Sequence, residues 1–160
     1  MLNTLGFIVV LSATALAVSL ATAEASPSTA ALISQGELRL QQNDIDGAIT
    51  TLTRATDQAP NSSLAHTRLG GAYLLAQRYD DAIAQFQQAI GQDANNAAAF
   101  IGMGIAYLHS GRLEAAKAAL GEAKRIDPDK TTQIDDLIAR IDQRATESPH
   151  EQSKGRALAQ

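Results

Sequence analysis

The chain has 160 residues and a formal net charge of −4; hydrophobic residues make up 45% of it, but aromatic residues only 4%. The lack of cysteine excludes disulfides, thiolate metal sites and a cysteine nucleophile. The 13 basic and 17 acidic residues form no basic run, which argues against nucleic acid as the main partner. Alanine accounts for 31 residues, and such small side chains suit closely packed helices better than a bulky β core.

Residues 1–25 are predicted to be a signal peptide or an N-terminal anchor rather than part of the fold. No charged side chain precedes Glu24, and a largely apolar run extends from Leu5 to Leu20. Small residues in an A-x-A arrangement follow at 21–23 and 23–25, which is typical of a cleaved secretory signal. The run is short for a membrane span, which takes roughly 20 residues, but no Lys or Arg precedes it. An uncleaved anchor therefore stays open, and either reading places the rest of the chain outside the cytoplasm.

A repeat of 34 residues organises the chain from residue 29 onward. Gly36, Gly70 and Gly104 are separated by this interval. Five further columns of matching residues follow the same spacing: Ile45/Tyr79/Leu113, Ala48/Ala82/Ala116, Leu52/Phe86/Leu120, Ala55/Ala89/Ala123, and Pro60/Pro128 with Ala94 between them. A period of this length is typical of stacked helix pairs.

Each period predicts two helices with a turn between them. In the second unit, apolar residues recur at helical spacing over 69–74 and again over 83–90, with Gln77-Arg78 as the turn. Asp80-Asp81 lies where a helix N-terminus favours negative charge, and Asn61-Ser62 and Asn95-Asn96 supply N-cap residues. We expect the Gly36/Gly70/Gly104 column to face Ala48/Ala82/Ala116, Ala55/Ala89/Ala123 to leave room for the next unit, and Leu52/Phe86/Leu120 to fill the space between units.

These columns resemble the tetratricopeptide repeat (TPR) family. The second unit carries its pattern in Leu69-Gly70, Tyr73, Ala82, Phe86 and Ala89, and the third in Phe100, Met103-Gly104, Tyr107, Ala116, Leu120, Ala123 and Pro128. The first unit is degenerate, with Gln35 and Arg39 where Leu and Tyr are usual. The resemblance implies an all-α solenoid over 26–145, with repeats at 29–62, 63–96 and 97–130.

A capping helix is predicted over 131–145, followed by a disordered tail over 146–160. Ile134, Leu137, Ile138 and Ile141 recur at i, i+3, i+4 and i+7 on a segment that also carries charged residues such as Arg140. An amphipathic helix of this kind covers the exposed end of a solenoid. The hydrophobic periodicity stops at Thr146, which is the reason for the predicted disorder.

No catalytic or metal-binding constellation emerges, so the chain is predicted to be neither an enzyme nor dependent on a cofactor. His66, His109 and His150 have no second His or carboxylate at the i+3 or i+4 spacing of a helical metal site. Gly102-Met103-Gly104 lacks the preceding strand of a phosphate-binding loop and lies within a predicted helix.

The resemblance assigns the first helix of each repeat to a concave groove, which is the predicted binding surface for a partner. The candidate residues are Ile33, Glu37, Thr67, Arg68, Gly71, Leu75, Ile101, Ile105 and His109. Family members that grip a peptide's C-terminal carboxylate carry Lys, Asn and Arg at several of these positions, whereas here only Arg68 is cationic. A carboxylate clamp is therefore disfavoured, and an apolar or amphipathic helical segment fits better. Leu74 and Leu108 could equally pack between neighbouring helices.

We therefore expect a periplasmic or secreted protein–protein interaction module, such as a scaffold or assembly factor that holds a short segment of a partner protein. The alternative is a membrane-anchored adaptor with an uncleaved N-terminal helix, which would contact the membrane only through that helix. Self-association through the apolar groove is also open. The assembly role is implied by the resemblance alone.

Overall fold

The computed structural model describes the backbone of residues 27–157 and the side chains of residues 27–146. Every regular element in that range is helical: α1 (Thr29–Gln41), α2 (Ile45–Gln58), α3 (Ser63–Leu75), α4 (Tyr79–Gln92), α5 (Ala97–His109), α6 (Leu113–Ile126), the short 3-10 turn η1 (Pro128–Lys130) and α7 (Thr131–Ala157). The predicted all-α fold is confirmed. Helices α1, α3, α5 and α7 begin at intervals of 34 residues, as do α2, α4 and α6.

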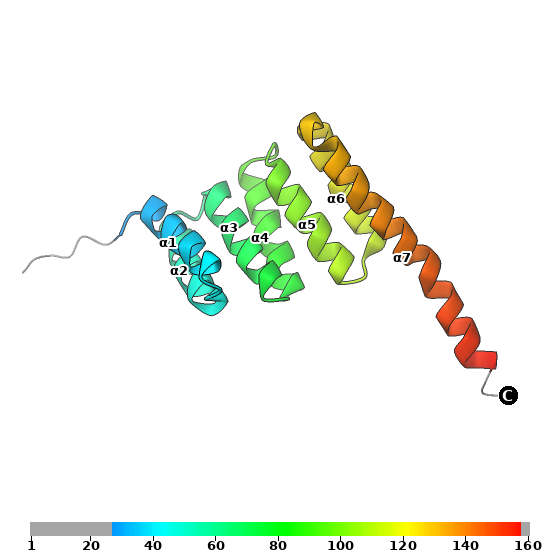
Figure 1. Ribbon diagram of the computed structural model, residues 1–160. Helices are drawn as coiled ribbons and strands as arrows, with labels where there is room; N and C mark the ends of the chain where they lie inside the picture. The colour runs from blue at the N-terminus through cyan, green and yellow to red at the C-terminus, as the bar shows by residue number, and fades with distance from the viewer. Residues whose placement is uncertain (1–26, 158–160) are drawn as a thin grey trace, which may run out of the picture.

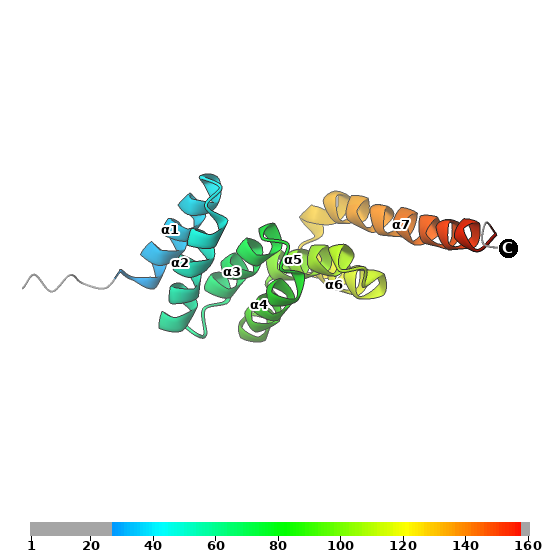
Figure 2. The ribbon, with the colours of Figure 1, turned by 90° about the horizontal axis from the view of Figure 1, so that it is seen from below.

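The helices follow one another in space in the order of the sequence. Helices α1, α3 and α5 lie on one face of the molecule and α2, α4 and α6 on the other (Figures 1 and 2). Each helix packs against the next in sequence, and α1, α3 and α5 also contact one another in that order. Helix α7 packs on α6 and then projects beyond the repeats (Figure 1). This is the layout of an α-solenoid.

Side-chain caps fix the N-termini of α3 and α5 at the positions that the sequence indicates. The Ser62 hydroxyl accepts a hydrogen bond from the backbone N–H of Ala65 at 3.2 Å, and the Asn96 amide oxygen accepts one from Ala99 at 3.0 Å. Helix α4 has no side-chain cap, but Asp80 and Asp81 lie in its first turn. Their negative charge is favourable beside the unpaired N–H groups there.

The turn inside each helix pair contains one residue with a left-handed backbone. The φ angles are 61° at Asn43, 59° at Gln77 and 76° at Gly111, which occupy the same place in the three repeats. Asn and Gly adopt this conformation readily, whereas Gln does so at a cost of about 1–2 kcal/mol. The turn geometry therefore repeats even though its sequence does not.

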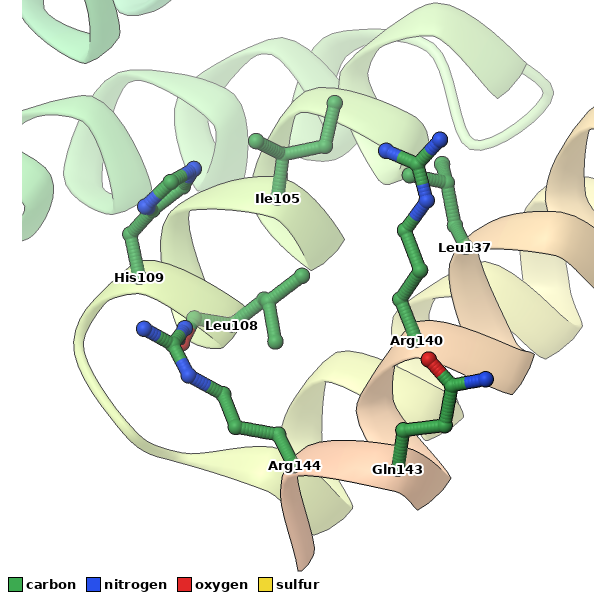
Figure 3. A pocket seen from close by; sticks show the side chains of 7 residues that line it. All are labelled: Ile105, Leu108, His109, Leu137, Arg140, Gln143 and Arg144. Carbon is green, nitrogen blue, oxygen red and sulfur yellow. Dashed lines mark hydrogen bonds between the residues drawn. The ribbon is translucent and has the colours of Figure 1, made fainter. Parts of the chain in front are cut away.

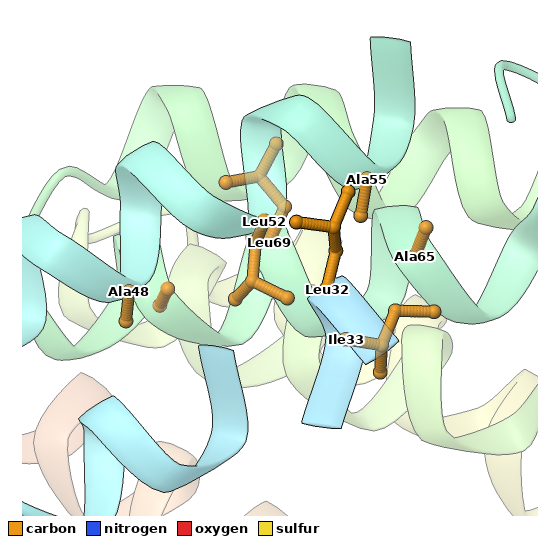
Figure 4. Packing of buried hydrophobic residues seen from close by; sticks show 8 residues of the cluster. Leu32, Ile33, Ala48, Leu52, Ala55, Ala65 and Leu69 are labelled. Carbon is orange, nitrogen blue, oxygen red and sulfur yellow. The ribbon is translucent and has the colours of Figure 1, made fainter. Parts of the chain in front are cut away.

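Three clusters of buried apolar side chains run through the solenoid. The first joins α1, α2 and α3 through Leu32, Leu52 and Leu69 with alanines between them (Figure 4). The second joins α4 and α5, and the third joins α6 and α7. Leu32 and Leu52 are completely buried, and full burial of such a side chain contributes about 1.5–3 kcal/mol. The many small residues let the helix axes approach closely around these few large ones.

The glycine column accommodates the largest residue of the same repeat. A Cβ atom on Gly36 would lie 2.5 Å from Cγ of Leu52, and one on Gly70 would lie 2.8 Å from the Phe86 ring. Carbon atoms in contact are normally about 3.5–4 Å apart. At Gly104 a Cβ atom would also lie 3.3 Å from the backbone oxygen of Ala116, as the predicted contact with the alanine column requires, but the atoms nearest each glycine of the column belong to the larger residue. The larger side chain, one turn further along the second helix, reaches across and fills the space.

Phe86 also bridges two repeats, as its column was predicted to do. A Cβ atom on Gly102 of α5 would lie 2.3 Å from Cζ of Phe86, which is only 2% exposed. The ring thus lies between Gly70 of its own repeat and Gly102 of the next. Gly102 is inside α5, where its role is to admit this ring.

The first repeat departs from the repeat pattern because it forms the end of the described solenoid. Gln35 is exposed, whereas its equivalent Leu69 is buried between repeats. Arg39 replaces a tyrosine and forms a 2.5 Å ion pair with Asp44, the N-cap residue of α2. Polar residues on a terminal repeat keep the end of a solenoid soluble.

Helix α7 begins where the capping helix was predicted, and Ile134 and Ile141 are fully buried against α6. The helix continues to Ala157, however, beyond the predicted boundary at 145 and through most of the tail that was expected to be disordered. Loss of hydrophobic periodicity removes packing partners but does not itself end a helix, and Glu, Gln, Lys and Arg are good helix formers. The predicted signal peptide or anchor lies outside the described residues. No described helix is long and apolar enough to cross a lipid bilayer.

Candidate interaction groove

A chain of connected hollows runs across the face formed by α1, α3, α5 and α7. The first lies between α1 and α3, the second and third between α3 and α5, and the fourth between α5 and α7. Neighbouring hollows share lining residues: Arg68 joins the first three, and Ile105 joins the third to the fourth. They therefore form one continuous groove. All nine candidate residues from the sequence line it.

The middle of the groove, between α3 and α5, is its most apolar part. It has a volume of about 310 Å³ and is lined by Leu40, Leu74, Leu75, Phe86, Ile101 and Ile105, with Gly71 and Gly102 between them. Leu75 is 57% exposed. A Cβ atom on Gly71 would meet no atom within 4 Å, so the groove is open above this residue. Leu74 packs against the core and also lines the groove, so the two alternatives for it are not exclusive.

The one cation that the sequence places in the groove is not available as a free charge. The Arg68 Nε donates a hydrogen bond to a carboxylate oxygen of Glu37, which joins α3 to α1. Both side chains are about two-fifths exposed. The pair neutralises this end of the groove, which leaves no unpaired Lys or Arg among the residues that line the hollow between α1 and α3.

Two of the candidate residues offer little surface to a partner. Ile33 is 7% exposed and belongs to the first core cluster. Thr67 is 8% exposed and accepts a 2.8 Å hydrogen bond from the Asn96 amide, which also donates to Ser63. This network connects α3 to the N-cap of α5. Thr67 therefore helps to hold two repeats together, a role that its position in the sequence does not reveal.

Helix α7 forms a wall of the groove that the sequence reasoning missed. Leu137, Arg140, Gln143 and Arg144 face Ile105, Leu108 and His109 of α5 across a hollow of about 500 Å³ (Figure 3). Leu137, Arg140 and Arg144 are spaced i, i+3 and i+7, so a search for polar as well as apolar residues on one helix face would have grouped them. The sequence indicates Arg140 only as one of the charged residues of the predicted capping helix. His109, a candidate residue, stacks on Tyr79 of α4 with 5.4 Å between the ring centroids.

A separate apolar hollow of about 300 Å³ lies on the side of α5 that faces α6. Its lining combines large residues of α5 with alanines of α6: Phe100, Met103, Tyr107, Ala115, Ala118 and Ala119, with Glu122 at one edge. This hollow shares no lining residue with the groove. A binding experiment therefore has to distinguish a partner bound in the groove from one bound in this hollow.

The shifted titratable groups lie away from the groove. The pKa of Lys117 is raised by its hydrogen bond to Asp142, at 2.5 Å between α6 and α7, and that of Arg78 is raised by Asp81. Across the described side chains, no three His, Asp or Glu residues are arranged to hold a metal ion.

Family models identify the protein family to which this chain belongs. Two family models, both described as tetratricopeptide repeat, match residues 33–97 and 73–141 and together span the three repeats and part of α7. The chain belongs to the TPR family. None of the curated protein sequences matches this TPR chain significantly.

Solved TPR domains share the fold at low sequence identity. The first TPR domain of Spaghetti (RPAP3), bound to an HSP90 peptide, is 20% identical with a TM-score of 0.71, covering 74% of this chain and 94% of that one. The TPR2B domain of yeast Sti1, in a complex with pHsp70, is 21% identical with a TM-score of 0.71, covering 74% and 99%. The Sgt2 TPR domain from Aspergillus fumigatus is 17% identical with a TM-score of 0.72, covering 78% and 83%. At these identities the likeness concerns the fold.

Proposed function

We propose that this TPR chain is a non-catalytic, exported interaction module that holds a short helical or apolar segment of a partner protein in its groove. In that role it would act as a scaffold or an assembly factor. TPR domains are protein-interaction domains, and the solved domains that resemble this chain include complexes with HSP90 and HSP70 peptides. A protein partner is the part of the proposal that the family supports directly.

The observation that carries the proposal is the continuous groove with its apolar middle. Leu75 at 57% and Leu64 at 50% exposure are two of the three large apolar side chains that the described structure leaves exposed, and both line the groove. Exposed apolar surface of this kind, bordered by polar residues, marks interaction sites. An amphipathic helix lays its apolar face into such a groove through side chains one turn apart.

The charges of the groove argue against the way in which some TPR domains grip a terminal carboxylate. Ile33, Gly71, Ile101 and Ile105 occupy places where that binding mode requires polar or cationic side chains. Arg68 is already paired with Glu37. A carboxylate placed at this end of the groove would lose its hydration without gaining an unpaired cation, which is unfavourable.

Export is proposed from the leader sequence alone. The apolar run over residues 5–20 and the A-x-A sites behind it favour cleavage after residue 23 or 25. The second candidate, a membrane-anchored adaptor, retains this segment. N-terminal sequencing of the protein recovered from its host distinguishes the two. A mature start at Glu24 or Ser26 supports the exported form, and a retained Met1 supports the anchor.

A matched pair of leucines tests the groove. Leu75→Asp places a charge in the apolar middle of the groove, whereas Leu38→Asp places one on α1, outside every groove hollow, at a position that is 51% exposed. Neither leucine is buried, so both variants should fold. In quantitative pull-downs with the full chain as bait, we expect Leu75→Asp to lose the partners that wild type and Leu38→Asp retain. Equal recovery by the two variants, with helicity intact by circular dichroism, would refute a groove-based function.

A further inference from the structure

The charge of the groove changes along its length. Between α1 and α3 the two charged residues, Glu37 and Arg68, neutralise each other. Between α3 and α5 the lining combines Arg68, Lys130, Asp93 and Asp127, and Lys130 is paired with Asp127. Between α5 and α7 the charged lining residues are Arg140 and Arg144, and no carboxylate is among them. The hollow between α5 and α7 is therefore the part of the groove whose charged lining residues are all basic.

Arg140 is the residue that makes this end suited to an anion. It is exposed and forms no ion pair or hydrogen bond with any described side chain. Figure 3 shows its guanidinium reaching from α7 toward the space above Ile105, beside Leu137. A guanidinium beside an apolar surface binds a carboxylate well because it presents several N–H donors in a planar fork.

Arg144 has a supporting role in the same wall. Its Nη1 donates a hydrogen bond to the Leu108 carbonyl oxygen at 3.4 Å, close to the C-terminal end of α5. That helix end carries partial negative charge, so the arginine is held there. This contact holds Arg144 against α5, while Arg140 supplies the donor groups for a ligand.

We propose, building on the proposed function, that the partner segment carries an acidic side chain next to its apolar residues. The apolar residues lie over Leu75 and Ile101, and the Asp or Glu side chain pairs with Arg140 between α5 and α7. This fixes the direction of the segment, with its acidic end toward α7. Figure 3 shows Arg140 and Arg144 reaching from α7 into the hollow that Ile105 and Leu108 of α5 also line. An acidic side chain within a segment that lies over Leu75 and Ile101 can reach the Arg140 guanidinium in this hollow, which shares Ile105 with the apolar middle of the groove.

Peptide libraries test the chemistry without requiring the natural partner. The bait is the full chain, and the probes are random 16-residue peptides displayed in two formats, one with both ends joined to the carrier and one with a free C-terminus. We expect the first format to yield binders that combine Leu, Ile or Phe with Asp or Glu. Selection on Arg140→Gln should keep the apolar preference and lose the acidic one. Arg54→Gln removes the same charge from an exposed site on α2 and should change neither preference.

A double-mutant cycle then measures the pairing on one selected peptide. We expect Arg140→Gln to weaken its binding by about 1.4- to fivefold, which is the range for an exposed ion pair. Changing the acidic residue of the peptide to its amide should weaken binding to wild type by the same factor and should have no further effect on Arg140→Gln. Raising the salt concentration should reduce the difference between wild type and variant, because exposed charges are screened.

The remaining outcomes separate this inference from the proposed function. Peptides that lose binding with Leu75→Asp but show no acidic preference and no response to Arg140→Gln would overturn the acidic pairing alone. Peptides that bind Leu75→Asp unchanged, or a failure of both formats to yield binders, would overturn the groove function and the pairing with it. If acidic binders appear only in the format with a free C-terminus, Arg140 binds a terminal carboxylate and not an acidic side chain, which would overturn the proposed pairing. A dimer in sedimentation that Leu75→Asp dissolves would make a second copy the occupant and would also overturn the proposal.

Discussion

Two glycines that line the same groove should respond in opposite ways to the same substitution. Gly71 of α3 and Gly102 of α5 are both inside helices and both lie in the apolar middle of the groove. A Cβ atom on Gly71 would meet nothing within 4 Å, whereas one on Gly102 would lie 2.3 Å from Cζ of Phe86. Gly71→Ala and Gly102→Ala therefore differ in the space available and in little else.

The magnitudes follow from these two surroundings. Replacing glycine by alanine inside a helix stabilises it by about 1 kcal/mol, and Gly71→Ala should show this gain in full. At Gly102 the new methyl group comes more than 1 Å too close to Phe86, a ring that is 2% exposed and confined by Gly70 on its other side. Such overpacking costs about 1–3 kcal/mol. Gly102→Ala should thus be less stable than Gly71→Ala by that amount.

Urea denaturation of both variants and wild type, followed by circular dichroism, measures the difference. The expected order of stability is Gly71→Ala first and Gly102→Ala last or equal to wild type. A Gly102→Ala variant as stable as Gly71→Ala would show that Phe86 does not occupy the space between α3 and α5. In a Phe86→Leu background Gly102→Ala should cost less stability than it does in wild type, because the smaller side chain leaves room for the new methyl group.

Two further predictions concern the turns and the junction with α7. Gln77→Gly should stabilise the protein by about 1 kcal/mol, because glycine adopts the φ of 59° without strain, and Gly111→Ala should destabilise it by a similar amount. Urea midpoints that move in the same direction for both would contradict this. The pKa of Lys117, raised by the hydrogen bond to Asp142, should fall in Asp142→Asn, as followed by NMR of the lysine Cε. Because the folded-state pKa is raised, the stability gained from this pair is present below the ordinary value of 10.5 and is lost as the pH rises through the folded-state pKa. An unchanged lysine titration in Asp142→Asn would contradict the pairing.

The repeat made most of the fold predictable from the sequence. Glycine, alanine and N-cap residues recur every 34 positions because each helix pair makes the same contacts within itself and with the next pair. The period therefore predicts where each described pair begins. The partner of the glycines was less predictable. Both Ala82 and Phe86 lie on the face of α4 that turns toward Gly70, and only the three-dimensional packing shows that the larger one fills the gap.

The site was predictable only where it repeats. The positions that line the groove in one repeat line it in the next, which identified Leu75, Ile101 and Ile105. Helix α7 is not a repeat, so the same alignment could not place Arg140. Burial was a second limit, because whether Thr67 faces a partner or Asn96 depends on the distance between α3 and α5. The length of α7 was missed because disorder was inferred from a lost hydrophobic pattern, and helix formation does not require one.

The proposed function requires the groove to be the surface that receives a partner, and NMR with methyl-labelled isoleucine and methionine tests this most directly. A peptide selected on the full chain should shift the methyl signals of Ile101 and Ile105, which line the groove. The Met103 methyl, in the separate hollow that faces α6, should stay in place. Shifts centred on Met103 with unchanged Ile101 and Ile105 would contradict the account and move the binding surface to the other side of α5.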